Sequence, residues 1–259
     1  MLTLVKLGGS LITDKRVEAS FRADVMDRLA TEIRDALRDE IKLIIGHGSG
    51  SFGHFAAQRH NTINGVRTLE QWRGFAEVAT IAAQLNNLVA KSLHEHDVPV
   101  WCIQPSASIQ CENGIITTMA TQPLQAALNN QLVPLLYGDV ALDTIRGGTI
   151  ISTETIFAHL VHHFPVNRIL LLGEVDGVYD AEKRIIPHIT SDNIESFKHA
   201  FGGSEGTDVT GGMYTKVLGM LALTRVRPDL QIRIMNGKQA DLLRRTLLEQ
   251  DAPGTLITL

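Results

Sequence analysis

Four apolar segments of this chain are each followed directly by a loop that contains glycine. The loops are Gly8-Gly9-Ser10, residues 46–54 (GHGSGSFGH), Gly138-Asp139 and Asp176-Gly177. Apolar segments that alternate with helical patterns through short links are typical of a parallel β-sheet, and the loops at the carboxyl ends of its strands open onto one edge. We therefore expect the four loops to lie close together and to form a ligand-binding edge.

Hydrophobic periodicity predicts an α/β fold along the chain. Because strands and helices alternate, the sheet should be mainly parallel, with right-handed crossovers. Helices are expected over 22–39, 68–97 and 238–250, and a loop running into a helix over 207–226. Strands are expected over 2–7, 41–46, 98–104, 131–140, 230–237 and 254–258, with a further strand that begins at residue 166 and ends in an acidic loop.

Two β-hairpins are predicted in addition to the parallel layer. One has an Asn-Gly turn in SIQCENGIITT (108–118), and the other has a Gly-Gly turn in DVALDTIRGGTIIS (139–152). We expect them to form a lid over one edge of the sheet. Since no Pro/Ser-rich linker interrupts the pattern, residues 1–259 are expected to form one domain with an N-terminal and a C-terminal half.

The composition is that of a globular protein, with 44% hydrophobic and 20% charged residues among 259. A net charge of −4 without long basic runs argues against non-specific nucleic-acid binding. Cys102 and Cys111 have no metal-site spacing and are expected to be reduced, structural thiols. The N-terminus does not resemble a signal peptide, and no window has the roughly 18 apolar residues of a membrane span, so a cytoplasmic location is expected.

The glycine loops are suited to binding phosphate. Glycine lets the backbone approach an anion closely, and the first N–H groups of a following helix supply donors. The loop 46–54 matches neither the P-loop, because no Gly-Lys-Ser/Thr follows, nor the dinucleotide pattern G-x-G-x-x-G with its later acidic residue. A tight strand-to-helix turn is the alternative explanation for any one of the loops.

Three lysines are candidate phosphate partners. Lys6 lies inside an apolar strand, where an ammonium group is costly unless a counter-charge such as phosphate is present. The alternative explanation is that the methylene stem of Lys6 carries its ammonium group to the surface at the end of the strand. Lys216 follows Gly212 by four residues in the first turns of a predicted helix, while Lys15 lies in the polar segment TDKR, where a solvated side chain is the alternative.

Five motifs carry a resemblance to the amino acid kinase superfamily. VKLGGSLITDK, GHGSGSFGH, YGDV, VDGVYD and DVTGGMYTK have the order and spacing of that superfamily, and the Gly-Ser-Phe-Gly-His ending is similar to that of the isopentenyl phosphate kinases within it. The resemblance implies an open αβα sandwich around a mainly parallel sheet, usually as a homodimer. It also implies ATP bound by the C-terminal half, with Mg2+ bridging its phosphates, and the phosphate acceptor bound by the N-terminal half.

The resemblance also implies site residues. The expected catalytic residues are His54, Lys6, Lys216 and Lys15. The expected nucleotide contacts are Lys6, Gly8, Gly9, Ser10, Asp176, Gly177, Tyr179, Gly212 and Lys216. The expected acceptor contacts are Gly48, Ser49, Gly53, His54, Phe75, Val78 and Thr153. The chain departs from the family pattern at ISTETI, which contains Thr153 and Glu154, and at GEVDGVY, which contains Gly173 and Glu174.

His54 is more specific to the isopentenyl phosphate kinases than the motifs that the whole superfamily shares. A phosphate acceptor is already anionic, so the task is to bring two anions together rather than to remove a proton. A histidine can donate a hydrogen bond to the acceptor phosphate while loop amides bind the other oxygens. The alternative is a histidine that caps a helix. The helical cluster His159, His162 and His163 lacks a carboxylate or cysteine to complete a metal site, so a partly exposed helix face is expected.

The resemblance therefore implies an enzyme of isoprenoid biosynthesis (the mevalonate pathway) that transfers the γ-phosphoryl group of ATP to isopentenyl phosphate, giving isopentenyl diphosphate and ADP. The apolar face of the 68–97 helix (Phe75, Val78, Ala79, Ile81, Ala82) would then wall the pocket for the isoprenoid chain. Two alternatives remain open. One is a kinase of the same fold that acts on another small phosphate or phosphonate such as fosfomycin, and the other is a nucleotide-binding sensor without catalysis.

Overall fold

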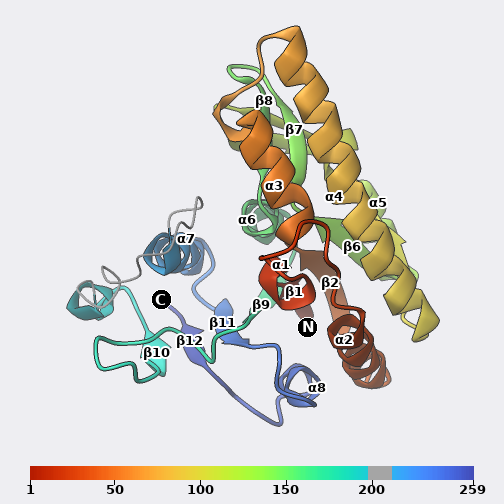
Figure 1. The fold of residues 1–259 in the computed structure, drawn as a ribbon. Helices are drawn as coiled ribbons and strands as arrows, with labels where there is room; N and C mark the ends of the chain where they lie inside the picture. Colours follow the sequence, from red (N-terminus) through yellow and green to blue (C-terminus); the bar gives the residue numbers. More distant parts are fainter. Residues whose placement is uncertain (198–211) are drawn as a thin grey trace.

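The computed structural model describes residues 1–197 and 212–259, and its centre is an eight-stranded sheet (Figure 1). All neighbouring strands in this sheet are parallel except β11 and β12. The expectation of a mainly parallel sheet is therefore confirmed. In spatial order the strands are β10 (His188–Ile189), β12 (Thr255–Ile257), β11 (Gln231–Asn236), β9 (Val166–Gly173), β1 (Leu2–Leu7), β2 (Lys42–His47), β6 (Val133–Tyr137) and β3 (Val100–Cys102).

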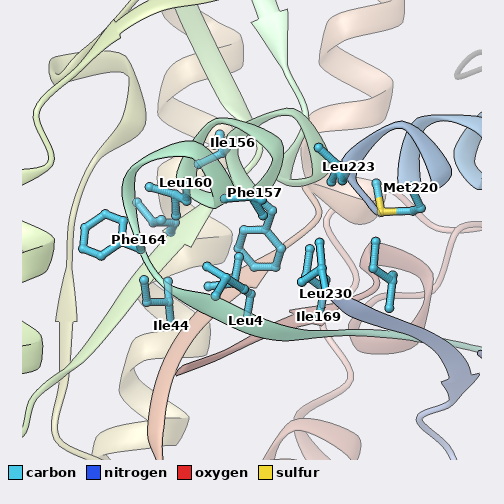
Figure 2. Packing of buried hydrophobic residues seen from close by; sticks show 14 of the residues in the cluster. Leu4, Ile44, Ile156, Phe157, Leu160, Phe164, Ile169, Met220, Leu223 and Leu230 are labelled. Atoms are coloured by element: carbon cyan, nitrogen blue, oxygen red, sulfur yellow. The ribbon is translucent and has the colours of Figure 1, made fainter. Parts of the chain in front are cut away.

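Helices cover both faces of the sheet. Because side chains alternate along a strand, Leu4 and Val5 of β1 belong to different hydrophobic clusters. Leu4 packs beneath α6 (Thr153–His163) and α7 (Gly212–Val226), and Figure 2 shows Phe157 of α6 above it. Val5 belongs to the cluster formed with α2 (Ala23–Leu37), α4 (Leu69–Glu95) and α8 (Leu242–Leu247). The expected αβα sandwich is confirmed.

The two predicted hairpins form one separate sheet, in the order β5-β4-β7-β8. β4 (Ile109–Glu112) and β5 (Ile115–Met119) are joined by Asn113 and Gly114, which both have positive φ, as an Asn-Gly hairpin turn requires. β7 (Asp139–Asp143) pairs with β8 (Gly147–Ile151), and β4 and β7 pair in parallel. The turn of the second hairpin comes earlier than predicted, at residues 144–146, because Gly147 already starts β8.

The predicted loop 46–54 is half helical. α3 (Gly50–His60) begins within it and lies alongside α4 (Figure 1). The predicted 238–250 helix is shorter than expected, since α8 begins only at Leu242. The buried carboxylate of Glu32 accepts hydrogen bonds from the amides of Asp241, Leu243 and Arg244 and so fixes that start.

The remaining helices are short. They are α1 (Gly9–Ile12), α5 (Gln122–Asn129) and the 3-10 turns η1 (Thr62–Asn64) and η2 (Pro105–Ala107). None of the helices within the described ranges is long and apolar enough to cross a membrane.

Both cysteines are free thiols. Cys102 is exposed and Cys111 is buried.

Candidate active site

The glycine loops meet at the carboxyl edge of the sheet, as predicted. The amide of Gly8 donates to the Leu172 carbonyl at 2.9 Å, which links the loop after β1 to the end of β9. The amide of Gly48 donates to Leu7 at 3.1 Å, and that of Gly138 donates to His47 at 3.0 Å. Loops that are far apart in the chain therefore form one continuous surface of backbone.

Gly9 and the loop after β2 approach each other closely. A Cβ atom on Gly9 would lie 2.6 Å from the nitrogen of Gly50, and one on Gly48 would lie 3.0 Å from the nitrogen of Gly9. Gly50 also has a φ of +51°, which side chains rarely adopt. Glycine is required at these positions because two main chains cross there.

Helix α3 starts at this crossing. Ser49 is its N-cap but makes no side-chain cap hydrogen bond, while the Ser51 amide is taken by the Thr13 hydroxyl at 2.9 Å. The first amides of a helix have no partner in a preceding turn, and the helix dipole makes this end favourable for an anion. The start of α3 is thus chemically suited to hold phosphate oxygens, and the acceptor contacts expected at Ser49 and its neighbours remain a prediction.

The positive charges of Lys6 and Lys216 both stabilise the ionised carboxylate of Glu154. Lys6 forms an ion pair with Glu154, and the two side chains are only 14% and 18% exposed. Burial raises the pKa of Glu154, but the charges of Lys6 and Lys216 outweigh that effect and leave this pKa lowered. The structure therefore brings together the two predicted cations, which the chain separates by more than two hundred residues. Glu154 is a partner that sequence reasoning named only as a departure from the family pattern.

His54 lies within helix α3, in its second turn. The N-cap of this helix is Ser49 and its C-cap is Asn61, so the capping alternative does not describe His54. Its side chain is exposed, and its ring meets the ring of Phe55 edge-on, with centroids 6.3 Å apart. His54 is therefore accessible to a ligand at the start of α3.

Lys15 lies apart from the buried cations. It is exposed on the turn that connects α1 to α2, next to the ion pair of Asp14 and Arg16. The same segment is attached to α3, because the Ser20 amide donates to the Ser51 hydroxyl at 3.2 Å.

Three of the predicted nucleotide contacts, Asp176, Gly177 and Tyr179, lie in the segment after β9. Asp176 accepts hydrogen bonds from the side chains of Asn236 (2.7 Å) and Tyr179 (3.1 Å). Gly177 is buried, and a Cβ atom there would lie 2.8 Å from the Thr255 hydroxyl. Gly212 begins α7 with a φ of +69°, while residues 208–211 of the DVTGG motif lie outside the described residues.

Glu174, in the segment after β9, links residues from the N-terminal and C-terminal parts of the chain. It forms ion pairs with Arg22 at 3.0 Å and with Lys238 at 2.7 Å, and Arg22 also donates to the Ser10 carbonyl. Burial raises the pKa of Glu174, but these two cations outweigh burial, so the pKa is lowered. Sequence reasoning did not select Arg22 or Lys238, because their partner is distant in the chain.

An apolar cluster borders α3 on the side of α4. Its buried members are Ala56, Val78 and Val140. Ala57, Phe75, Ala79, Ile81 and Ile150 pack against them. We call this set the α3–α4 cluster, and it contains the predicted acceptor contacts Phe75 and Val78.

Thr153 is placed differently from the other expected acceptor contacts. Its side chain is 1% exposed, and its hydroxyl donates to the His47 carbonyl at 2.6 Å. The side chain therefore joins α6 to β2. An acceptor contact at this position would have to come from the backbone.

The histidine cluster lies on α6. The rings of His159 and His163 face each other with centroids 4.4 Å apart, and His162 and His163 are exposed. Burial and the two neighbouring histidines lower the pKa of His159.

The family model described as "Amino acid kinase family" matches residues 1–236. The chain therefore belongs to the amino acid kinase family.

Two curated relatives make the relationship narrower. The isopentenyl phosphate kinase of Methanocaldococcus jannaschii is 33% identical over 256 residues, covering 96% of this chain and 95% of the relative. That of Methanothermobacter thermautotrophicus is 32% identical over 271 residues, covering 99% of both chains. An X-ray structure of isopentenyl phosphate kinase matches the whole of both chains with a TM-score of 0.85 and 29% identity. The resemblance stated from the sequence is confirmed.

Proposed function

We propose that this chain transfers the γ-phosphoryl group of ATP to isopentenyl phosphate, giving isopentenyl diphosphate and ADP. The observation that carries this proposal is the composition of helix α3. Its first turn meets the glycine loops, His54 is exposed in its second turn, and Ala56 and Ala57 belong to the α3–α4 cluster. An anionic group and a short apolar chain can thus be bound along one helix, which is the chemistry of an isoprenoid monophosphate.

The reaction needs positioning and charge balance more than proton transfer. An oxygen of the acceptor phosphate attacks the γ-phosphorus, a new P–O bond forms, and the bond from the γ-phosphorus to the β,γ-bridging oxygen breaks as ADP leaves. Lys6 and Lys216 balance the negative charge, with Glu154 fixing their positions. His54 donates to the acceptor phosphate, and the loops of Gly8-Gly9-Ser10 and Gly48-Ser49 bind oxygens through their amides.

The proposal includes Mg2+, bound together with the nucleotide phosphates. Residues 1–197 and 212–259 contain no group of three or more His, Cys, Asp or Glu side chains placed to hold a metal ion. When bound, Mg2+ would neutralise the phosphates that it bridges.

The two halves of the single domain are proposed to bind different substrates. The N-terminal half holds the acceptor, and the C-terminal half holds ATP through Asp176, Gly177, Tyr179 and Gly212. Lys15, on its exposed turn, is kept as a catalytic candidate that reaches the phosphates when both substrates are bound. The enzyme is proposed to be a cytoplasmic homodimer, which light scattering of the purified protein tests.

ADP release with a panel of acceptors tests the function. The panel is isopentenyl phosphate, dimethylallyl phosphate, fosfomycin, UMP, glutamate, aspartate and carbamate. We expect the highest kcat/KM for isopentenyl phosphate. Preference for fosfomycin would support the phosphonate alternative. ATP binding without turnover of any acceptor would support the sensor.

A further inference from the structure

His47 is a fully buried histidine directly below the glycine crossing, and the proposed reaction does not use it. It ends β2, its exposure is 0%, and its ring stacks on Tyr137 with centroids 5.7 Å apart and planes 12° apart. Its Nδ1 lies 3.0 Å from the carbonyl oxygen of Gly48, and its Nε2 lies 3.2 Å from Oδ1 of the Asn86 side chain. Contacts with β6, with α4 and with the loop after β2 therefore fix the orientation of this ring.

The partners of this ring define its tautomer. A carbonyl oxygen only accepts, so Nδ1 must carry the proton that is donated to Gly48. Burial lowers the pKa of His47, and the two hydrogen bonds offset this only in part, so the ring is neutral at neutral pH. The Asn86 atom that faces Nε2 is an oxygen, and a neutral ring has only one N–H for two facing oxygens. The Gly48 carbonyl belongs to the backbone, whereas the Asn86 amide can turn over, so the arrangement that satisfies both ring nitrogens has Nδ1 protonated and the Asn86 NH2 group turned toward Nε2.

The direction of the Gly48 carbonyl determines the direction of the next amide. The peptide bonds are trans, and in a trans peptide C=O and N–H point in opposite directions. Because His47 draws the Gly48 carbonyl into the core, the Ser49 N–H is directed away from the core. In the described part of the chain this N–H donates to no protein group. It is therefore available at the start of α3, where the acceptor phosphate is expected.

We propose that His47 is a positioning residue that aims the Ser49 N–H at the acceptor phosphate by holding the Gly48 carbonyl in the core. This inference rests on the proposed function and names a residue that acts through the loop rather than on the substrate.

The backbone of His47 also contacts α6. Its carbonyl accepts from both the Gly138 amide at 3.0 Å and the Thr153 hydroxyl at 2.6 Å. Thr153 precedes Glu154, the partner of Lys6. His47 thus links the acceptor loop to the helix that holds the catalytic cations.

Two isosteric variants separate positioning from packing. In His47→Asn the amide NH2 can occupy the place of Nδ1–H, whereas in His47→Gln it occupies the place of Nε2. We expect the Asn variant to stay within about 3-fold of wild type. The Gln variant should raise KM for isopentenyl phosphate about 10- to 100-fold, the range for a hydrogen bond to a charged group, with KM for ATP unchanged. Equal KM values for the acceptor in two folded variants would overturn the proposal.

A measurement on the unaltered protein covers the case in which a variant does not fold. ¹⁵N NMR of the imidazole side chains should show His47 as the Nδ1–H tautomer at pH 7, and an Nε2–H tautomer would overturn the proposal. Failure of the function is distinguishable. Wild type that releases no ADP with isopentenyl phosphate refutes the substrate assignment, and the variants are then compared on the panel acceptor that is turned over.

Discussion

Lys6 and Glu154 are 148 residues apart in the chain and form an ion pair at the carboxyl end of β1. The sequence suggested that a bound phosphate would supply the counter-charge for Lys6. The structure shows that a carboxylate from the first turn of α6 already does so. A phosphate that binds here therefore contacts cations whose positions are already fixed. It shares their positive charge with the carboxylate of Glu154.

Replacing Lys6 by Met should remove turnover and also lower stability. The variant removes the cation that forms an ion pair with the partly buried carboxylate of Glu154. Losing one member of a fully buried pair costs 3–5 kcal/mol. Since both side chains retain some exposure, we expect about 1–3 kcal/mol, measured by urea denaturation beside kcat.

The double variant Lys6→Met/Glu154→Gln is the matched control. It removes both charges, so stability should return toward that of wild type while turnover stays lost. A single variant as stable as wild type, or a double variant as unstable as the single, would contradict this balance of charges. Lys216→Ala should also abolish turnover, with a smaller change in stability.

His54→Ala should lower kcat by about 10²-fold or more, because a donor aimed at charge in the transition state is typically worth that much. His54→Gln keeps a donor and should recover part of the loss. The side chain is exposed, so the melting temperature should not change. Gln58→Ala, one turn further along the same exposed face of α3, is the control and should retain full activity. Full activity of His54→Ala on its best acceptor would refute the catalytic role.

Sequence patterns predicted the elements whose signals are local. Thr68 caps α4 with a capping box that includes Gln71, as the spacing allows, and the Asn113-Gly114 turn forms as predicted. Helix α3 was missed because its segment contains glycines and has little amphipathic pattern. It is stabilised by packing against α4 and by the crossing at Gly9, which are contacts outside its own segment.

The site was predictable in its loops and cations but not in its carboxylates. Glycine after a strand and lysine in an apolar strand are local signals. In contrast, the partner of Lys6 is Glu154, and the partner of Glu174 is Arg22, 152 residues away. No local pattern distinguishes either glutamate from a solvated one. Their roles follow from the strand order, which places β1 between β2 and β9.

Asp143 should make the hairpin sheet sensitive to acid. Its carboxylate is 4% exposed and accepts four backbone amides, two from the first hairpin turn and two from the second. Burial raises the pKa of Asp143, but these amides outweigh burial and lower it below its ordinary value of 3.8. A carboxyl with a lowered folded-state pKa stabilises above its unfolded pKa, and this contribution is lost as pH falls through the folded-state pKa.

Asp143→Asn should therefore destabilise the protein by about 1–3 kcal/mol at pH 7. Thermal melts from pH 7 to pH 3 should show the gap to wild type narrowing once the pH falls below 3.8. Glu112→Gln removes an exposed carboxylate from the same hairpin and should leave the profile unchanged. A gap that stays constant with pH would show that the charge of Asp143 is not what holds the turns.

Side chains of the α3–α4 cluster should determine how long a chain the acceptor can have. Phe75 and Ile81 are partly buried in the α3–α4 cluster, and the Phe75 ring meets Trp72 at 5.2 Å between centroids. An isoprenoid tail gains affinity from apolar burial at about 0.8 kcal/mol per CH2. Trimming either residue to Ala removes a wall of that cluster, so at least one variant should gain activity on geranyl phosphate relative to isopentenyl phosphate.

Leu88→Ala is the control for this change of specificity, because Leu88 lies exposed on the same helix and does not belong to the cluster. It should leave the ratio of kcat/KM values for the two acceptors unchanged. A small polar acceptor would gain nothing from a longer pocket, since it has no chain to bury. Flat profiles across isopentenyl, geranyl and farnesyl phosphates in every stable variant would therefore contradict the isoprenoid assignment, while leaving phosphoryl transfer itself in place.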